Sequence, residues 1–228
     1  MNQKPLIRLE SICKRFGTAN VFDNFSHSIY AGKHQLITGP SGCGKTTLLK
    51  MMALLEPTNK GTIYYKGTDV TNKHGQPGIA QDITNLRIGY VSQDRDLWPH
   101  LTVQENILLA LKVSGRDYSY NDTFFKIVGK LKLTDHLEKR PGDLSGGQQQ
   151  RCAIARCLIH NPDIVFLDES FANLDEENIA SAFEIIDAVV EQGATIVLVS
   201  HRTKLPTKLF SKIINLDTPK STEGFCNA

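Results

Sequence analysis

One stretch of nine residues limits what this chain can fold into more than any other: Gly39-Pro40-Ser41-Gly42-Cys43-Gly44-Lys45-Thr46-Thr47. It fits the pattern G-x-x-x-x-G-K-[ST]. It follows an apolar run typical of a buried strand, Gln35–Thr38, and precedes a run typical of a helix, Thr47–Leu55. In that context the glycines let successive backbone N–H groups turn toward one anion, and the helix N-terminus adds partial positive charge. The stretch therefore predicts a phosphate-binding loop, and a chance glycine-rich turn is the weaker interpretation.

Four side chains give this loop a chemistry. In such loops the lysine, here Lys45, reaches the β and γ phosphates, and the hydroxyl of Thr46 is a ligand for Mg²⁺. Further along, Asp168 and Glu169 end the apolar run Val165–Leu167. Carboxylates at the C-terminal end of a strand lie where doubly wound sheets bind ligands. Asp168 is thus placed to hold Mg²⁺ and Glu169 to polarise an attacking water, whereas without the loop upstream a solvated strand edge would be the better interpretation.

Strand and helix patterns alternate along most of the chain. The strand patterns cover Leu6–Phe16, Val21–Tyr30, Gly61–Gly67, Ile88–Gln93, Asp163–Asp168, Thr195–Ser200 and Lys212–Leu216. Apolar residues recur with helical spacing from Val103 to Leu137, over Ser145–Ile159 and over Glu176–Gln192. This alternation predicts an α/β chain with a mostly parallel sheet and an inserted helical segment.

Composition excludes several classes of protein. The chain has 228 residues, with 40% hydrophobic and 22% charged side chains, as in ordinary globular proteins. Its net charge of +2 favours neither a nucleic-acid partner nor an acidic tail. We expect no membrane-inserted segment and no signal peptide, because no apolar run is long enough and none follows Met1–Pro5. The five cysteines have no C-x-x-C spacing, which is typical of free thiols in a reducing cytoplasm.

A second motif lies further along the chain: Leu144-Ser145-Gly146-Gly147-Gln148-Gln149-Gln150-Arg151. From its residues it is a helix N-terminus with a serine cap and two glycines that leave backbone N–H groups open, which makes a second anion site. With the phosphate loop and the Asp168-Glu169 pair in this order, the chain resembles the nucleotide-binding subunit of ABC transporters. The resemblance extends from Leu6 to about Leu216, and its LSGGQ-type signature is highly specific to ABC ATPases.

The resemblance implies a fold and a domain organisation. It implies an α/β P-loop NTPase core with a mostly parallel sheet and an N-terminal antiparallel β subdomain. A helical subdomain is inserted within the core at about residues 94–160. All of these parts belong to a single ABC ATPase domain that covers residues 1–228.

The resemblance also implies the site residues. Phe16 matches the aromatic residue that stacks on adenine, although a core aromatic is the alternative. The expected catalytic residues are Glu169, Gln93, which touches Mg²⁺ and the attacking water, and His201, which contacts the γ-phosphate. The residues expected to bind ATP are Phe16, Gly39, Pro40, Ser41, Gly42, Cys43, Gly44, Lys45, Thr46, Thr47, Ser145, Gly146 and Gly147. The residues expected at Mg²⁺ are Thr46, Gln93 and Asp168.

Partners follow from the same resemblance. Two copies of an ABC ATPase subunit face head to tail, so that each ATP lies between Lys45 of one copy and Ser145 of the other. Closure of this sandwich drives separate transmembrane permease subunits, which hold the chain on the cytoplasmic face of the inner membrane. One departure concerns the loop after Glu169, where Ser170-Phe171-Ala172-Asn173 replaces the usual Pro-Thr-Ser-Ala and puts the local geometry in doubt.

Three functions other than transport fit the sequence less well. A soluble ABC protein of DNA repair would carry a long coiled coil between Gln93 and Ser145, but this interval spans 52 positions without a sustained heptad. A translation type would carry two cassettes, and a binding module that has lost hydrolysis would not retain Lys45 and the two acids. The transported substrate stays open, since Pro99–Val103 resembles importers of polar amino acids while exporters and lipid-transport ATPases share much of the pattern.

Overall fold

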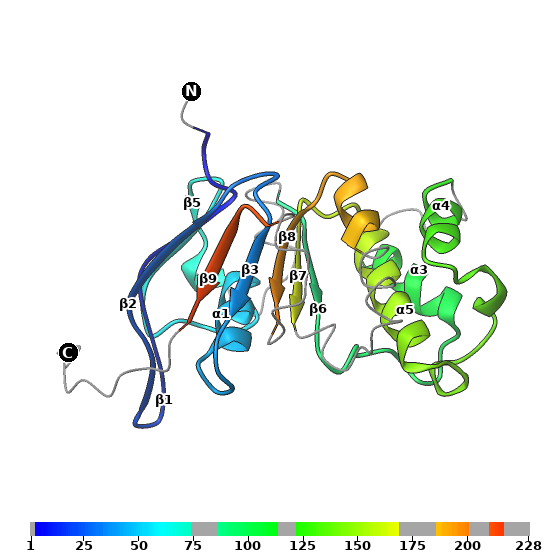
Figure 1. Ribbon diagram of the computed structural model, residues 1–228, viewed down its shortest axis with the longest axis horizontal. Helices are drawn as coiled ribbons and strands as arrows, with labels where there is room; N and C mark the ends of the chain where they lie inside the picture. The colour runs from blue at the N-terminus through cyan, green and yellow to red at the C-terminus, as the bar shows by residue number, and fades with distance from the viewer. Residues whose placement is uncertain (1–2, 74–85, 114–121, 169–185, 201–209, 217–228) are drawn as a thin grey trace. The chain divides into compact units, whose positions relative to one another are not determined.

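Figure 1 shows the computed structural model, which describes residues 3–73, 86–113, 122–168, 186–200 and 210–216. The chain forms two compact units: unit 1 comprises Met1–Leu86 and Val197–Ala228, and unit 2 comprises Arg87–Ile196. The described strands form a four-stranded antiparallel sheet and a five-stranded sheet in which β3 pairs in parallel with β8 and β9, and β6 with β7. Helices follow several of the parallel strands, so the predicted α/β fold with a mostly parallel sheet and an N-terminal antiparallel part is confirmed.

The antiparallel sheet belongs to unit 1 and has the strand order β2-β1-β4-β5. Its strands are β1 (Ile7–Phe16), β2 (Ala19–Ile29), β4 (Lys60–Tyr65) and β5 (Thr68–Asp69). Ile7 and Leu9 are buried at the start of β1, as alternation predicts. The pairing of β1 with β2 then shifts between Leu9 and Ile12 and again on both sides of Lys14. Such irregularities re-aim side chains, and here they flank the buried Lys14 and precede the exposed Phe16.

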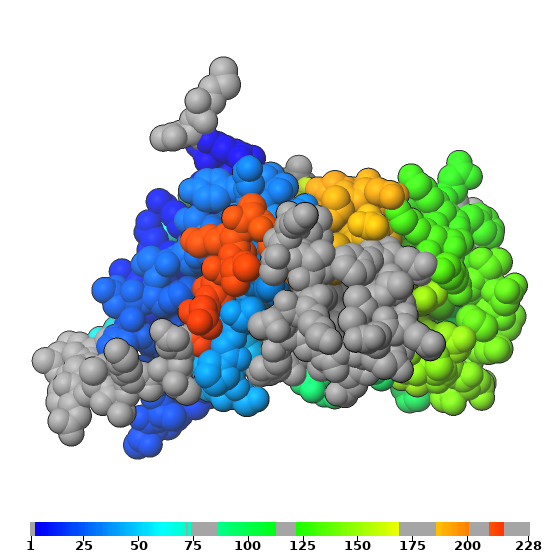
Figure 2. All heavy atoms as spheres, in the orientation of Figure 1, coloured from blue at the N-terminus to red at the C-terminus, as the bar shows by residue number. Residues whose placement is uncertain are grey.

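The rest of unit 1 surrounds the strand that leads into the phosphate loop. This strand, β3 (Gln35–Thr38), pairs in parallel with β9 (Lys212–Asn215) and with Val197–Val199 of β8 (Thr195–Val199). Strand β9 lies at the surface on the face that Figure 2 shows, where it is orange-red, and it is mostly exposed. A short 3-10 helix, η1 (Thr71–Lys73), follows β5.

Helix α1 (Lys45–Met52) differs from its predicted limits of Thr47–Leu55. It begins two residues earlier, at Lys45, because Gly44, whose backbone is left-handed, is its N-cap. It ends earlier because Leu54 adopts a left-handed φ of 57°. The N–H of Leu55 then bonds to the carbonyl oxygen of Lys50 at 2.8 Å, which closes the helix. The sequence pattern predicted a longer helix because Leu54 and Leu55, which follow the helix, are also apolar.

Unit 2 contains two parallel strands and the helical segment. Its strands are β6 (Ile88–Val91) and the fully buried β7 (Ile164–Asp168), paired with Tyr90 opposite Phe166. Its helices are α3 (Val103–Val113), α4 (Asp122–Lys130), the 3-10 turns η2 (Thr134–His136) and η3 (Pro141–Asp143), α5 (Gly146–Leu158) and the helical residues 186–191. Helix α3 packs along α5 (Figure 1). Strand β6 ends before Gln93, which the sequence had placed at its end.

The parallel sheet has the strand order β6-β7-β8-β3-β9. Helices α3, α4 and α5 fall within residues 94–160, the limits expected for the helical subdomain. The assignment of all 228 residues to a single ABC ATPase domain stays a prediction. Across the described ranges, no helix combines the length and the apolar character needed to cross a membrane.

Candidate functional site

The predicted phosphate loop leads from β3 into α1 within unit 1. Gly39 and Gly44 are the positions at which a side chain does not fit. Gly39 has a φ of 150°, and a Cβ there would lie 2.3 Å from the carbonyl oxygen of Leu216. Gly44 is the N-cap of α1 with a φ of 96°, and its Cβ would lie 2.5 Å from Cγ1 of Val21. Both glycines are thus required because the loop packs closely against the rest of unit 1 and has a positive φ at each position.

The ammonium group of Lys45 is held by this loop. The residue is 4% exposed, and its Nζ donates to the carbonyl oxygens of Gly39 at 3.0 Å and Pro40 at 2.8 Å. Nζ also lies 3.9 Å from Sγ of Cys43. These acceptors are neutral, so they satisfy the N–H groups and leave the positive charge in place. A positive charge in a glycine-rich loop at a helix N-terminus favours a polyanion such as a triphosphate.

Phe16 ends β1 and is half exposed, so it does not belong to the buried core. The core alternative for this aromatic residue therefore does not hold. One neighbour of its ring is the ammonium of Lys14, which lies 4.6 Å from the ring centroid. The remaining exposed area is apolar and flat, which suits stacking of a planar base.

In unit 2, Asp168 ends β7 and is 3% exposed. The hydroxyl of Tyr90, on the neighbouring strand β6, donates to Oδ2 of Asp168 at 3.0 Å. Burial, followed by the negative charge of Asp168, raises the pKa of Tyr90 well above its usual range. The phenol therefore stays protonated and keeps donating, which fixes one oxygen of the carboxylate. Sequence reasoning had not singled out Tyr90, although its place on the strand beside the acidic one could have drawn attention to it.

The second predicted anion site is the N-terminus of α5. Oγ of Ser145 accepts a hydrogen bond from the N–H of Gln148 at 3.3 Å, and Oε1 of Gln148 accepts one from the N–H of Ser145 at 2.9 Å. This capping box confirms the predicted serine cap. Ser145, Gly146 and Gly147 are all exposed. The helix terminus therefore presents backbone to the surface, and a Cβ built on Gly146 would lie 3.6 Å from Nη2 of Arg95.

Comparison with known proteins identifies the family. Residues 22–172 match the family model described as ABC transporter. The arginine transport ATP-binding protein ArtM of Bacillus subtilis is 37% identical over 215 residues, which cover 93% of this chain and 88% of ArtM. The glutamate/aspartate import ATP-binding protein GltL of Escherichia coli is 34% identical over 222 residues, which cover 96% of this chain and 90% of GltL.

Solved structures agree with this match. The dimeric post-hydrolysis state of the ATP-binding cassette MJ0796, bound to ADP and Pi, has a TM-score of 0.79 at 28% identity. The alignment covers 96% of this chain and 100% of that one. This chain belongs to the ABC transporter ATP-binding family. It is accordingly an ATPase that powers transport, and the adenine nucleotide is its ligand. The soluble, non-transport alternative gains no support from these relatives.

In this ABC ATPase, the segment after β6 is tied to the helix that the signature motif begins. Nη1 of Arg95 donates to Oε1 of Gln149 at 3.2 Å, and its Nε donates to Oε1 of Gln150 at 3.3 Å. Arg156 of α5 donates in return to the carbonyl oxygens of Arg95 at 2.8 Å and Asp96 at 2.6 Å. Gln93, which is exposed, lies two residues before this tie. No local sequence pattern predicted these contacts.

Some predicted site residues lie outside the described part of the chain. They are Glu169, His201 and the departure from the family pattern at residues 170–173. The roles predicted for Gln93, Phe16 and the loop residues remain predictions as well. Among the described residues, no group of three or more His, Cys, Asp or Glu side chains could hold a metal ion.

Proposed function

We propose that this ABC ATPase binds Mg²⁺-ATP on its phosphate loop and hydrolyses it as a dimer with a second ABC ATPase subunit. In this arrangement Ser145, Gly146 and Gly147 of one copy meet the ATP held by the other copy. The observation that carries the proposal is the N-terminus of α5, which is capped from within and exposed at Ser145, Gly146 and Gly147. The matched cassette MJ0796 is a dimer with ADP and Pi, which supports a paired arrangement.

Unit 1 holds the nucleotide. The residues proposed to surround the phosphates are Gly39, Pro40, Ser41, Gly42, Cys43, Gly44, Lys45, Thr46 and Thr47. Lys45 contributes the charge, and its hydrogen bonds to loop carbonyls keep its ammonium near the anion. Phe16 stacks on the adenine through its exposed ring. In this proposal the phosphate groups bind to residues 39–47 and the base binds to Phe16, two different parts of unit 1.

Mg²⁺ suits the oxygen donors of this chain. Thr46 has its hydroxyl in the first turn of α1, and Asp168 offers a buried carboxylate at a strand end. With Gln93 they form a set of hard oxygen ligands, which Mg²⁺ prefers. The bound ion would neutralise charge on the phosphates. We assign Asp168 and Gln93 to the Mg²⁺ of the nucleotide bound by unit 1 because the family resemblance implies it and because both offer oxygen ligands.

Hydrolysis then needs a positioned water. We assign this task to Glu169, assisted by Gln93, and the contact with the γ-phosphate to His201. The protein does little covalent work in such reactions, since positioning and charge neutralisation supply most of the rate. The fixed orientation of the Asp168 carboxylate by Tyr90 is one part of this positioning.

We propose that the chain lies on the cytoplasmic face of the inner membrane, where it passes the energy of hydrolysis to transmembrane permease subunits, and that the process is import of polar amino acids. ArtM and GltL are named for arginine transport and for glutamate/aspartate import, which supports this choice. Copurification of the chain with its permease from a detergent extract would test the partner. Uptake of radiolabelled amino acids into vesicles that contain the complex would test the substrate.

The dimer has a sharper test. Glu169→Gln keeps the size of the side chain and removes its charge, so hydrolysis falls by roughly 10²–10⁴-fold and ATP stays between the copies. We expect this variant to elute as a dimer with ATP and as a monomer without nucleotide, measured by size-exclusion chromatography with light scattering. Adding Ser145→Arg should restore the monomer, because a bulky side chain then covers the exposed turn. An elution volume that ignores ATP would contradict the shared site.

A further inference from the structure

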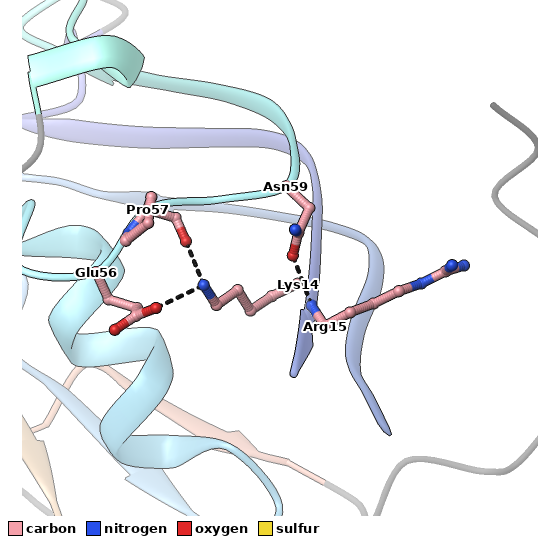
Figure 3. Close-up of polar contacts among 5 residues, drawn as sticks. All are labelled: Lys14, Arg15, Glu56, Pro57 and Asn59. Carbon is pink, nitrogen blue, oxygen red and sulfur yellow. Dashed lines mark hydrogen bonds and ion pairs between the residues drawn. The ribbon is translucent and has the colours of Figure 1, made fainter. Parts of the chain in front are cut away.

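A buried lysine of unit 1, Lys14, lies beside the exposed Phe16 and outside the phosphate loop. Lys14 is 4% exposed, and its ammonium donates to Oε1 of Glu56 and to the carbonyl oxygen of Pro57, both at 2.6 Å (Figure 3). The same nitrogen lies 4.6 Å from the centroid of the Phe16 ring. Burial of an ammonium is costly unless its charge is paired. Here a carboxylate, a carbonyl oxygen and a π face surround it.

The three groups fix both the nitrogen and the ring. An ammonium has three N–H donors, and two of them are directed at Glu56 and Pro57. The ring face takes the remaining direction, and attraction between the cation and the π electrons holds the ring there. Lys14 and Phe16 are two residues apart on β1, and across the irregular pairing there the ammonium of Lys14 lies over the Phe16 ring. Because half of Phe16 is exposed, the ring face turned away from Lys14 can receive a planar group.

The anchor of Lys14 comes from the segment that leaves α1, the helix that the phosphate loop begins. This segment is joined to the end of β1 by further hydrogen bonds. The N–H of Asn59 donates to the carbonyl oxygen of Cys13 at 2.9 Å, and the N–H of Arg15 donates to Oδ1 of Asn59 at 2.7 Å (Figure 3). The position of the Phe16 ring is therefore set from the far end of the phosphate-binding helix.

We propose that Lys14 is a positioning residue for the nucleotide base. It holds the Phe16 ring so that a purine stacks on the ring's free face, and it ties that ring to the helix that carries the phosphate loop. The inference rests on the proposed function, because it takes Phe16 as the stacking residue. It separates two affinities: binding of the base depends on Lys14, whereas binding of phosphate groups alone depends on residues 39–47.

The experiment compares two probes, ATP and inorganic triphosphate, by isothermal titration calorimetry on the full chain. Lys14→Met keeps the length of the side chain and removes its charge, so we expect ATP to bind about three- to tenfold more weakly. Inorganic triphosphate should bind within about twofold of wild type, because it has no base to stack. Lys14→Arg keeps the cation and should restore ATP affinity to within about twofold of wild type.

Two further variants keep the result interpretable. Arg15→Met is the matched control, because the Arg15 side chain extends away from the cluster in Figure 3 and only its backbone N–H takes part. It should change neither affinity by more than about twofold. Lys14→Gln retains a donor for Glu56 and Pro57 without the cation, and it replaces Lys14→Met if that variant does not fold. We expect it to show the same selective loss of ATP affinity.

A double-mutant cycle shows whether Lys14 acts through the ring. Phe16→Ala removes the stacking surface, so adding Lys14→Met in that background should weaken ATP binding no further. An equal loss in both backgrounds would overturn the proposal, as would a parallel loss of ATP and inorganic triphosphate, which indicates a structural role. If the wild-type chain binds triphosphate but gains nothing from the base, Lys14 has no such role while the phosphate loop stands. If it binds neither probe, the proposed function fails, and this inference fails with it.

Discussion

The phosphate loop of unit 1 and the segment after β6 in unit 2 reach their shapes in different ways. In the loop, Lys45 bonds to the carbonyl oxygens of residues five and six positions earlier. In the segment, Arg95 bonds to side chains 54 and 55 positions later in the chain. A motif that closes on itself carries its shape in its own sequence. A segment held by a distant helix has its shape only once that helix is in place.

Backbone conformation shows the same contrast. In the loop the left-handed conformations fall on glycines, Gly42 and Gly44, which adopt them without strain. In the segment they fall on Arg95 and Asp96, with φ of 66° and 47°. In non-glycine residues such conformations are strained, and contacts with the surrounding structure must stabilise them. Arg156 provides part of this stabilisation, because it donates to the carbonyl oxygens of both Arg95 and Asp96.

The largest effect should come from the loop. Lys45→Ala removes the positive charge while the glycines of the loop remain, so we expect ATPase turnover to fall by roughly 10²-fold or more. ATP binding should weaken strongly as well, and circular dichroism should report an intact fold. Steady-state phosphate release and calorimetry measure the two effects. Unchanged turnover in this variant would remove the loop from the reaction.

A tenfold effect is expected where a distant contact holds a site residue directly. Tyr90→Phe removes the hydroxyl that donates to Asp168, a residue 78 positions later in the chain. Hydrogen bonds to charged groups contribute about 1.5–3 kcal/mol, so turnover should fall by about tenfold or more at low Mg²⁺. The matched control is Tyr64→Phe in β4, where the ring lies under the guanidinium of Arg8 at 4.5 Å and the variant keeps that ring.

The second readout for Tyr90 is the metal dependence. The Mg²⁺ concentration that gives half-maximal ATP binding should rise in Tyr90→Phe and stay at the wild-type value in Tyr64→Phe. A loss of turnover without this shift would mean that the phenol supports the strand pair rather than the orientation of Asp168.

These contrasts explain which features could be predicted from the sequence. The phosphate loop, the buried strand ending at Asp168 and the serine cap of α5 each depend on residues within a few positions of one another. The contacts of Lys14, Tyr90 and Arg95 depend on strand register and helix packing, which no local pattern encodes. Lys14 shows the physical reason most plainly: irregular pairing on both sides of it places an ammonium in the interior, against the usual preference of lysine for the surface.

A moderate effect on stability is expected from the segment in unit 2. Arg95→Ala removes two hydrogen bonds and keeps the strained backbone, so the free energy of unfolding should fall by about 1–2 kcal/mol. For a chain of this size that lowers the midpoint of thermal unfolding by about 2–8 °C. Arg95→Gly removes the same bonds but adopts a φ of 66° freely, so it should be about 1 kcal/mol less harmful than alanine. Equal losses in both variants would show that the segment stores no strain.

The smallest effect concerns two thiols of α5, the helix that anchors this segment. Burial raises the pKa of Cys152 and of Cys157 to about 12, against a weaker lowering influence of Arg156. A raised pKa keeps a thiol protonated at neutral pH, and only the thiolate reacts with iodoacetamide. At pH 8 roughly one such group in 10⁴ is ionised, compared with roughly a quarter of unfolded cysteines whose pKa is about 8.5.

We therefore expect almost no labelling of Cys152 and Cys157 in the native chain within minutes and rapid labelling in urea, measured by mass spectrometry of their peptides. Raising the pH from 7 to 9 should increase the native labelling rate without bringing it near the unfolded one. The comparison becomes sharper in Arg95→Ala. If the segment after β6 stabilises α5, both thiols should label faster in that variant. If labelling stays at the wild-type rate, the hydrogen bonds of Arg95 position the segment after β6 but do not stabilise α5.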